Sequence, residues 1–365
     1  MPDKAPVTRP LFSLPTWMPG ERLLSAGLVL LLTIIVALIA VWPGDANIGA
    51  RVTRPSAEET LPSVPGMEPT TVSLVAGQVI AGATATDPAS GIVVLATPDL
   101  TAEAVAASVA VSMETHRIIT LYGHPHDPNM GILGEHPMED LLPILETQRS
   151  EYEAIDPSRP VVGAFEIIAT VAQQKPGADG TYILDTDIET LTKYVDFAAQ
   201  NNLLVFLDVQ IGRGTVAMEF EKVRPLLARP NVHLAIDPEF SMDEGEIPGQ
   251  SIGSVNASSI AYAQAELAAM VEQLNLPPKM LIVHQFQEDM ITDKMALTSV
   301  PGVELIIDAD GFGAPEMKTA VYDILVRDEP VGYAGIKLFY KQDTPLLTPA
   351  DVLKLLPAPD VIIYQ

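Results

Sequence analysis

The chain has 365 residues, of which 48% are hydrophobic, and it contains no cysteine. A chain of this size and apolar content can bury a large core, and the lack of cysteine excludes disulfides, thiolate metal sites and a cysteine nucleophile. The formal net charge of −26 argues against nucleic acid or anionic membrane surfaces as partners, because binding to phosphate requires clustered lysine and arginine.

One apolar segment near the N-terminus is long enough to cross a membrane. Residues 23–42, LLSAGLVLLLTIIVALIAVW, contain no charged residue, and a helix of this length spans roughly 30 Å. The run is longer than the apolar core of a cleaved secretion signal. We therefore predict an uncleaved transmembrane signal anchor after a cytoplasmic leader, residues 1–22. The short leader and the long acidic remainder predict a single-pass protein of the cell membrane with its N-terminus inside.

Residues 43–70 are rich in Pro, Thr, Ser and Glu. Such a composition buries little apolar surface and predicts a flexible linker. The remainder, residues 71–365, is expected to be one extracytoplasmic domain, although residues 71–115 do not indicate a particular structure.

From residue 116 onward, short β-rich apolar runs alternate with stretches of helical character. The expected strands are 117–122, 161–168, 203–209, 232–237, 280–284, 303–308, 335–339 and 361–364. The expected helices include 138–152, 187–200, 257–274 and 315–327. Asp185 and Asn256 are candidate capping residues. Alternating strands and helices imply an α/β fold with a parallel sheet, and eight units imply a closed (β/α)8 TIM-like barrel. A doubly wound open sheet is the alternative.

Polar side chains interrupt the apolar runs near the C-terminal ends of the strands. They are Glu166, Asp208, Asp237, His284, Asp308 and Lys337, and His124 and His126 follow the first strand. In a barrel these ends share one mouth, where active sites of this fold lie. Side chains alternate along a strand, so Asp237 and Glu239 are expected to share a face, with Leu234 and Ile236 facing the helices. Pro238 is expected to end the strand and to project Glu239 over the rim.

Two carboxylates at this spacing suit glycoside hydrolysis, which needs a protonated acid and a second carboxylate. Mutual repulsion is expected to keep Glu239 protonated near neutrality while Asp237 stays charged. The predicted catalytic residues are Glu239, Asp237, Glu166 and Asp208, the last two orienting substrate or water. The predicted substrate-binding residues are His124, His126, His284, Gln285, Asp308, Asp310, Lys337 and Tyr122. We expect a cell-envelope carbohydrate or another small polar substrate as the ligand, and no cofactor.

The segment IDPEF, residues 236–240, resembles the Asp-x-Glu ending of the fourth strand in the chitinase-like glycoside hydrolases of family 18. It is more loosely similar to the strand-end Asp-x-Glu of the lysozyme-like enzymes of family 25. The resemblance to family 18 implies that Glu239 is the proton donor and Asp237 its orienting partner. The first acid of the family 18 motif is missing, because Leu234 and Ala235 precede Ile236.

Several longer segments resemble a family of secreted or membrane-tethered bacterial barrel proteins. These segments are YGHPHDPNMGILGE (122–135), GAFEIIATVAQ (163–173), LDVQIGRG (207–214), LAIDPEF (234–240), IGSVNA (252–257), VHQFQ (283–287) and DADG (308–311). The resemblance implies an extracytoplasmic setting and carries no particular activity with it.

Two other hypotheses stay open on the sequence. His124 and His126 stand where amidohydrolases place a His-x-His pair for a divalent metal such as zinc, and His284 and Asp208 would complete such a site. This alternative is a metal-dependent hydrolase of the amidohydrolase or phosphodiesterase type. The other is a carbohydrate-binding or scaffold barrel without catalysis, although a chain with 5% aromatic residues offers few platforms for sugar rings.

Overall fold

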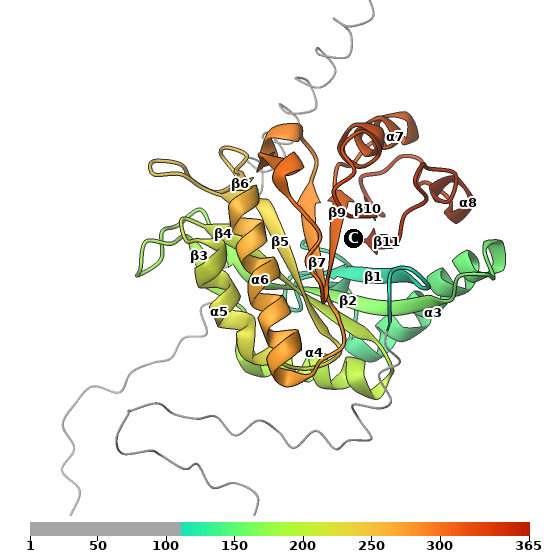
Figure 1. Cartoon of the computed structure of the whole chain (residues 1–365), viewed down its shortest axis with the longest axis horizontal. Coiled ribbons are helices and arrows are strands. Elements are labelled where there is room, and N and C mark those ends of the chain that lie inside the picture. The colour runs from blue at the N-terminus through green and yellow to red at the C-terminus, as the bar shows by residue number, and fades with distance from the viewer. Residues whose placement is uncertain (1–110) are drawn as a thin grey trace, which may run out of the picture. The chain divides into compact units, whose positions relative to one another are not determined.

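The computed structural model describes residues 111–365, which form a closed barrel of eight parallel strands (Figure 1). The strands are β1 (Arg117–Gly123), β2 (Val161–Ala172), β4 (Leu204–Gly212), β5 (Val232–Ser241), β7 (Lys279–Gln285), β9 (Val303–Ala309), β10 (Tyr333–Leu338) and β11 (Val361–Tyr364). Neighbours pair in this order, and β1 pairs with β11 on one side and β2 on the other, which closes the barrel. The predicted TIM-like barrel and its eight strands are confirmed, and the open-sheet alternative is wrong.

Helices connect most of the strands and pack around the barrel (Figure 1). They are α3 (Met138–Ile155), α4 (Ile188–Gln200), α5 (Val216–Leu227), α6 (Ala257–Leu274), α7 (Pro315–Tyr322) and α8 (Pro349–Val352). The Asn256 side chain caps α6 by accepting from the Ser258 N–H, as predicted. The expected cap at Asp185 is wrong: this residue ends the short strand β3 (Ile183–Asp185), and Asp187 caps α4. The helix expected over 315–327 ends at Tyr322 and continues as a π-helical turn.

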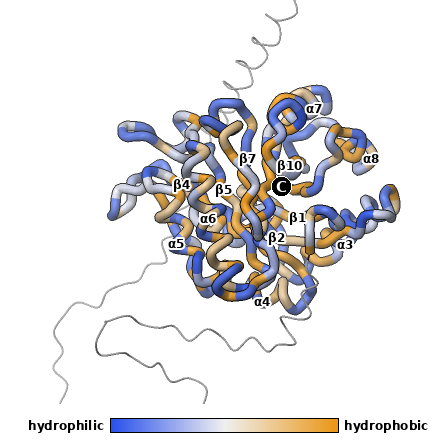
Figure 2. Tube along the Cα trace, in the orientation of Figure 1, coloured by the Kyte–Doolittle hydropathy of each residue, from blue (hydrophilic) through white to orange (hydrophobic). Residues whose placement is uncertain are grey.

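The barrel strands separate two apolar layers because side chains alternate along a strand. One layer contains residues of both strands and helices, and Leu234 and Ile236 belong to it, as predicted. The other fills the barrel interior and consists of strand residues together with Met113. Figure 2 shows apolar residues concentrated in the strands and polar ones in the outer loops. Below the interior, Glu304 at the start of β9 accepts hydrogen bonds from the Met113 N–H at 3.1 Å and the Ser112 hydroxyl at 3.2 Å.

The β5 strand does not end at Pro238, which corrects the expectation from the sequence. The pairing with β4 runs to Gln210 and Asp237, shifts in register, and resumes between Gly212 and Ser241. Proline lacks an N–H and cannot donate to the ladder, which explains the irregularity at Pro238. The strand nevertheless continues, because pairing with β4 resumes at Ser241. Glu239 lies in this irregular stretch, where its carbonyl oxygen accepts from the Gly253 N–H at 2.7 Å.

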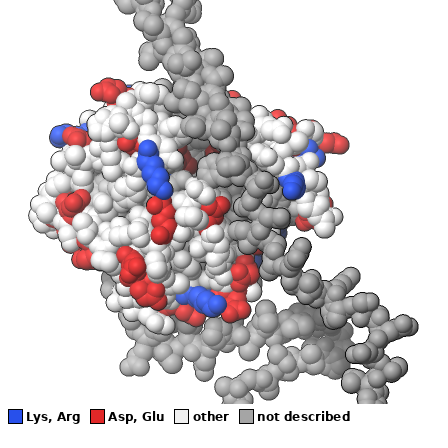
Figure 3. Space-filling view, turned by 180° about the vertical axis from the view of Figure 1, so that it is seen from behind, with Lys and Arg blue, Asp and Glu red and all other residues white. Residues whose placement is uncertain are grey.

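The predicted leader (1–22), signal anchor (23–42) and linker (43–70) lie outside the described residues, as do residues 71–110 of the predicted domain. Within residues 111–365, no helix has the length and apolar character needed to cross a bilayer. On the face shown in Figure 3, acidic side chains are more prominent than basic ones, in line with the net charge of the chain.

Candidate functional site

Polar residues occupy inward-facing positions on seven barrel strands, near the C-terminal ends of β1, β7, β9 and β10 and, since the other three strands extend further than expected, near the middle of β2, β4 and β5. They are Tyr122, Glu166, Asp208, Asp237, His284, Asp308 and Lys337. In β2, β4, β5, β7 and β9, the residue two positions earlier belongs to the apolar interior. Alternation along each strand therefore directs these polar side chains into the same barrel. The structure brings them together at one mouth.

His284 is at the centre of this group. Its Nε2 atom lies 2.8 Å from Glu166 Oε1, and its Nδ1 atom lies 3.0 Å from Asp308 Oδ2. Asp310 Oδ2 is 3.5 Å from the same Nδ1 atom. The side chains of His284, Glu166 and Asp308 are fully buried, so these contacts are shielded from water.

Lys337 extends the network toward the first strands. Its ammonium lies 3.2 Å from Asp310 Oδ2 and 3.6 Å from the centre of the Tyr122 ring. The Tyr122 hydroxyl in turn donates a hydrogen bond of 2.9 Å to Asp208 Oδ2. A continuous path of contacts therefore joins Asp208, on β4, to Glu166, on β2, through side chains of β1, β10 and β7 and through Asp310, which directly follows β9.

Asp237 and Glu239 lie on β5, next to Asp208 on β4. The Glu239 N–H donates to Asp237 Oδ1 at 3.2 Å, and the Gln210 side chain donates to Asp237 Oδ2 at 3.4 Å. The sequence analysis missed Gln210, although it stands two residues after Asp208 and the same alternation predicts that it faces inward.

The three carboxyl groups on β4 and β5 hold protons more tightly than usual. Burial raises the pKa of Asp208 to about 6, with Glu166 adding to the effect. Burial and the charge of Asp208 raise the pKa of Asp237 to about 7. Burial and the charge of Asp237 raise the pKa of Glu239 to about 8. Glu239 is therefore mostly protonated at neutral pH. Asp237 is not fully charged there, because it is buried too, and this corrects the expectation from the sequence.

Two positively charged side chains, His284 and Lys337, lie among these carboxyl groups. Burial disfavours the charged form of His284, but Glu166 and Asp308 outweigh burial and hold the pKa of His284 well above its usual range. Burial also acts against the charge of Lys337, yet Asp310 and Glu166 raise its pKa to about 12. Both groups are therefore cationic at neutral pH and compensate part of the carboxylate charge.

Three of the predicted binding residues take up other contacts. His124 Nε2 lies 3.1 Å from the Thr186 hydroxyl, and His126 Nε2 lies 3.2 Å from the Thr190 hydroxyl. These threonines stand at the start of α4, so the histidines link the β1 loop to that region. The Gln285 amide donates to the carbonyls of the loop after β7, at Gln287 and Glu288.

The alternative metal set of His124, His126, His284 and Asp208 is not brought together. Within residues 111–365, a different group satisfies the spacing for metal ligands: His284, Asp308 and Asp310 offer ligand atoms that lie within 4.8 Å of one another. The histidine pair of the first loop fails to join it because its side chains face the start of α4.

A buried ion pair that the sequence gave no reason to expect supports the mouth from the side of α7. The Lys318 ammonium lies 3.4 Å from Asp343 Oδ2 and donates to the carbonyls of Gly311 and Lys337. Asp343 accepts from the Phe339 N–H at 2.9 Å. The pair thus holds the loop after β9 and the end of β10, which carry Asp310 and Lys337. Lys318 is on a helix, where strand alternation gives no information about its direction.

Comparisons with known proteins found a structural similarity and no match to a family. No family model matches it, and no curated protein matches it. Among solved structures, that of a Bacillus subtilis mannanase is similar over 73% of this chain and 87% of that chain, with a TM-score of 0.34 and 9% sequence identity. A similarity of this degree does not establish a shared activity.

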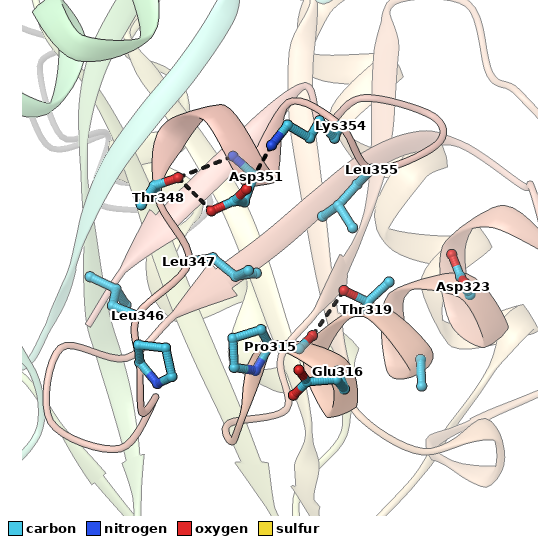
Figure 4. Close-up of a pocket in the computed structure, with 12 residues that line it drawn as sticks. Pro315, Glu316, Thr319, Asp323, Leu346, Leu347, Thr348, Asp351, Lys354 and Leu355 are labelled. Carbon is cyan, nitrogen blue, oxygen red and sulfur yellow. Dashed lines mark hydrogen bonds and ion pairs between the residues drawn. The ribbon is translucent and has the colours of Figure 1, made fainter.

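A surface hollow of about 820 Å³ lies between α7 and α8 (Figure 4). Its walls include Leu346, Leu347 and Leu355, and none of the mouth residues lines it. Asp351, on its rim, accepts from the Thr348 hydroxyl at 2.6 Å and from Lys354 at 2.9 Å. Thr348, Asp351 and Lys354 are thus engaged with one another, and the barrel mouth, where more ionisable side chains meet, is the candidate site.

We expect Gly335→Ala to reduce the free energy of unfolding of the full chain by about 1–3 kcal/mol, the usual cost of overpacking. A Cβ atom at Gly335 would lie 2.9 Å from Asp308 Oδ1 and 3.0 Å from Asp308 Cα, so the buried aspartate would have to move. Urea denaturation measures the change. Gly311→Ala is the matched control, since its Cβ meets nothing closer than 3.6 Å; equal stability of the two variants would contradict the expectation.

Proposed function

We propose that the protein hydrolyses glycosidic bonds of a cell-envelope carbohydrate at the barrel mouth, with Glu239 as the proton donor. One observation carries the proposal: Asp208, Asp237 and Glu239 lie on neighbouring strands with pKa values of about 6, 7 and 8. Environments that separate the proton affinities of nearby carboxyl groups produce the acid and the base that glycoside hydrolysis requires.

In the proposed reaction, the protonated Glu239 gives its proton to the glycosidic oxygen as the bond to the anomeric carbon breaks. Water adds to that carbon, and the proton that the water loses passes to an ionised carboxylate at the barrel mouth. Asp237 is the candidate for this carboxylate. Asp208 is the most acidic of the three groups, and its negative charge supports the positive charge that develops on the sugar. Glu166 holds His284 and orients the substrate.

A polyhydroxylated ligand also suits the unfilled hydrogen-bonding capacity of the site. In the part of the chain that the structure describes, Glu166 Oε2 and Asp208 Oδ1 are buried and have no hydrogen-bond partner. A carboxylate oxygen accepts hydrogen bonds, and leaving a buried one unpaired is costly. Sugar hydroxyl groups are donors and would satisfy these atoms.

The proposal includes the setting. Residues 23–42 would anchor the chain in the cell membrane with the N-terminus inside, and residues 43–70 would hold the barrel away from the bilayer on the outer side. This position would place the mouth near cell-envelope glycans. The length of the apolar run and the proline-rich composition of the linker support this arrangement.

The test is hydrolysis by the full chain over a panel of cell-envelope and plant glycans, followed across pH. We expect a bell-shaped dependence of kcat/KM with a maximum at about pH 7–8. A proton donor acts only while protonated, so activity falls as pH rises through the pKa of Glu239, about 8. The ionised partners are lost as pH falls through about 7 and about 6.

The charged groups that act on the pKa values of Asp237 and Glu239 lie on other parts of the barrel. They are Asp208, Asp310, Lys337 and His284. Circular dichroism over the same pH range separates loss of activity from loss of fold. Activity that continues to rise above about pH 9 would be inconsistent with Glu239 as the donor. Binding without hydrolysis across the panel would instead favour a carbohydrate-binding barrel.

A further inference from the structure

We propose that His284, Asp308 and Asp310 form a binding site for one divalent metal ion of the zinc or manganese type. This goes beyond the proposed hydrolysis and does not depend on it, because neither Glu239 nor Asp237 belongs to the ligand set. The ligand atoms of the three residues lie within 4.8 Å of one another. One imidazole nitrogen with two carboxylates is a donor set that suits zinc or manganese, whereas calcium takes six to eight oxygens.

Two of the three ligands lie on neighbouring strands with fixed register, and the third directly follows one of them. His284 on β7 pairs directly with Asp308 on β9. The Asp310 N–H donates to the Gln285 carbonyl at 2.9 Å, which holds Asp310 beside His284. The placement of His284 and Asp308 thus follows from the barrel strands, and the backbone hydrogen bond fixes Asp310 directly after β9.

The atoms around His284 Nδ1 can approach one another this closely only if a proton or a metal cation lies between them. Asp308 Oδ2 and Asp310 Oδ2 approach Nδ1 to 3.0 and 3.5 Å. A deprotonated imidazole nitrogen and two carboxylate oxygens are all electron-pair donors, so they can gather only around a proton or a metal cation. A divalent ion in this position would bind all three, while a proton serves one hydrogen bond at a time.

Unused ligand capacity supports the same inference. Asp308 Oδ1 and Asp310 Oδ1 are buried and have no hydrogen-bond partner among residues 111–365. Asp308 is fully buried, and the Asp310 side chain is 10% exposed. The Oδ1 atoms of the two aspartates could thus add to the coordination of an ion held by their Oδ2 atoms.

Glu166 supplies the outer support that metal-binding histidines usually have. Such a histidine donates its second ring N–H to a carboxylate, which fixes the ring and its tautomer. Glu166 Oε1 lies 2.8 Å from His284 Nε2, and both side chains are fully buried. When a metal ion displaces the proton on Nδ1, the proton on Nε2 would stay with Glu166 and the Nδ1 lone pair would be directed toward the two aspartates.

The charge of the group also accommodates a dication. Six carboxyl groups, Glu166, Asp208, Asp237, Glu239, Asp308 and Asp310, surround the two cations Lys337 and His284. A divalent ion that replaces the proton on His284 Nδ1 would raise the charge of the group by one, which a partly protonated carboxyl group such as Asp237 can offset by losing its proton. Lys337 can therefore stay in place beside Asp310.

The test is isothermal titration of the chelator-treated full chain with zinc chloride and with manganese chloride, together with elemental analysis of the bound metal. We expect one ion per chain and weaker binding of calcium. Glu166→Gln should weaken the affinity about 10–100-fold, the effect typical of an outer-shell partner, and Asp310→Asn should weaken it at least as much. Asp310 is the least buried ligand, and circular dichroism verifies that its variant is folded.

The double variant His124→Asn/His126→Asn is the matched control and should bind the ion as the wild type does. Glu239→Gln should also retain it, which keeps this test separate from the proposed hydrolysis. The proposal is overturned if the wild type binds neither ion, if Asp310→Asn binds as tightly as the wild type, or if the histidine double variant alone loses binding.

Discussion

Replacing Glu239 by glutamine is expected to lower kcat about 10²–10⁴-fold, the contribution typical of a positioned general acid. Glutamine fills the same space but has no proton to give to the departing oxygen. Burial and the charge of Asp237 raise the pKa of Glu239 to about 8, so the native side chain is largely neutral at pH 7. Exchange for a neutral amide therefore changes the local charge little, and the free energy of unfolding should stay close to that of the wild type.

Initial rates on the most active glycan of the panel measure this effect, and urea denaturation monitors stability. Glu244→Gln is the matched control, because Glu244 is an exposed acid a few residues away on the loop after β5. The control should keep full activity. A Glu239→Gln protein that hydrolyses at the wild-type rate would remove Glu239 from the reaction.

The largest effect on stability is expected for Asp343→Ala, at about 3–5 kcal/mol, the cost of breaking a buried ion pair from one side. The side chains of Lys318 and Asp343 are 2% and 1% exposed. The substitution leaves the Lys318 ammonium without its counter-ion. It also removes the acceptor of the Gly313 N–H at 2.8 Å and of the Phe339 N–H at 2.9 Å.

Urea denaturation of the full chain gives this difference, and Lys193→Ala provides the comparison. Lys193 pairs with Glu189 at 3.0 Å on the surface, where the two side chains are 63% and 79% exposed. Exposed pairs contribute about 0–1 kcal/mol. Similar losses in the two variants would mean that the Lys318–Asp343 pair does not hold the loops at the mouth.

The fold followed from the sequence because the barrel strands have a simple pattern. Each is a short apolar run bounded by a turn or a helix start, and eight such runs alternating with helices leave few architectures. The details that failed depend on local contacts. Asp185 and Asp187 are both acids before α4, and only the hydrogen bond to the Thr190 N–H identifies Asp187 as the cap. The continuation of β5 past Pro238 depends on a register shift that a neighbouring strand imposes.

The candidate site was predictable to the extent that strand alternation governs it. Glu166, Asp208, Asp237, His284 and Asp308 project inward because each follows an interior apolar residue by two positions. The direction of a loop residue has no such rule, and the histidines of the first loop turned toward α4. The raised pKa of Asp237 could not be foreseen either, because it depends on how completely the folded mouth excludes water.

The unbroken path of contacts from Asp208 through Tyr122, Lys337, Asp310 and His284 to Glu166 places the ionisable groups of the mouth within close electrostatic reach of one another. When ionisable groups interact this closely, protons leave in macroscopic steps that belong to the assembly. A substitution of any one of these residues is therefore expected to shift the pH range of activity, because it changes the pKa values of the other groups. The number of protons bound at the mouth therefore depends on the strands of the closed barrel keeping these side chains in place.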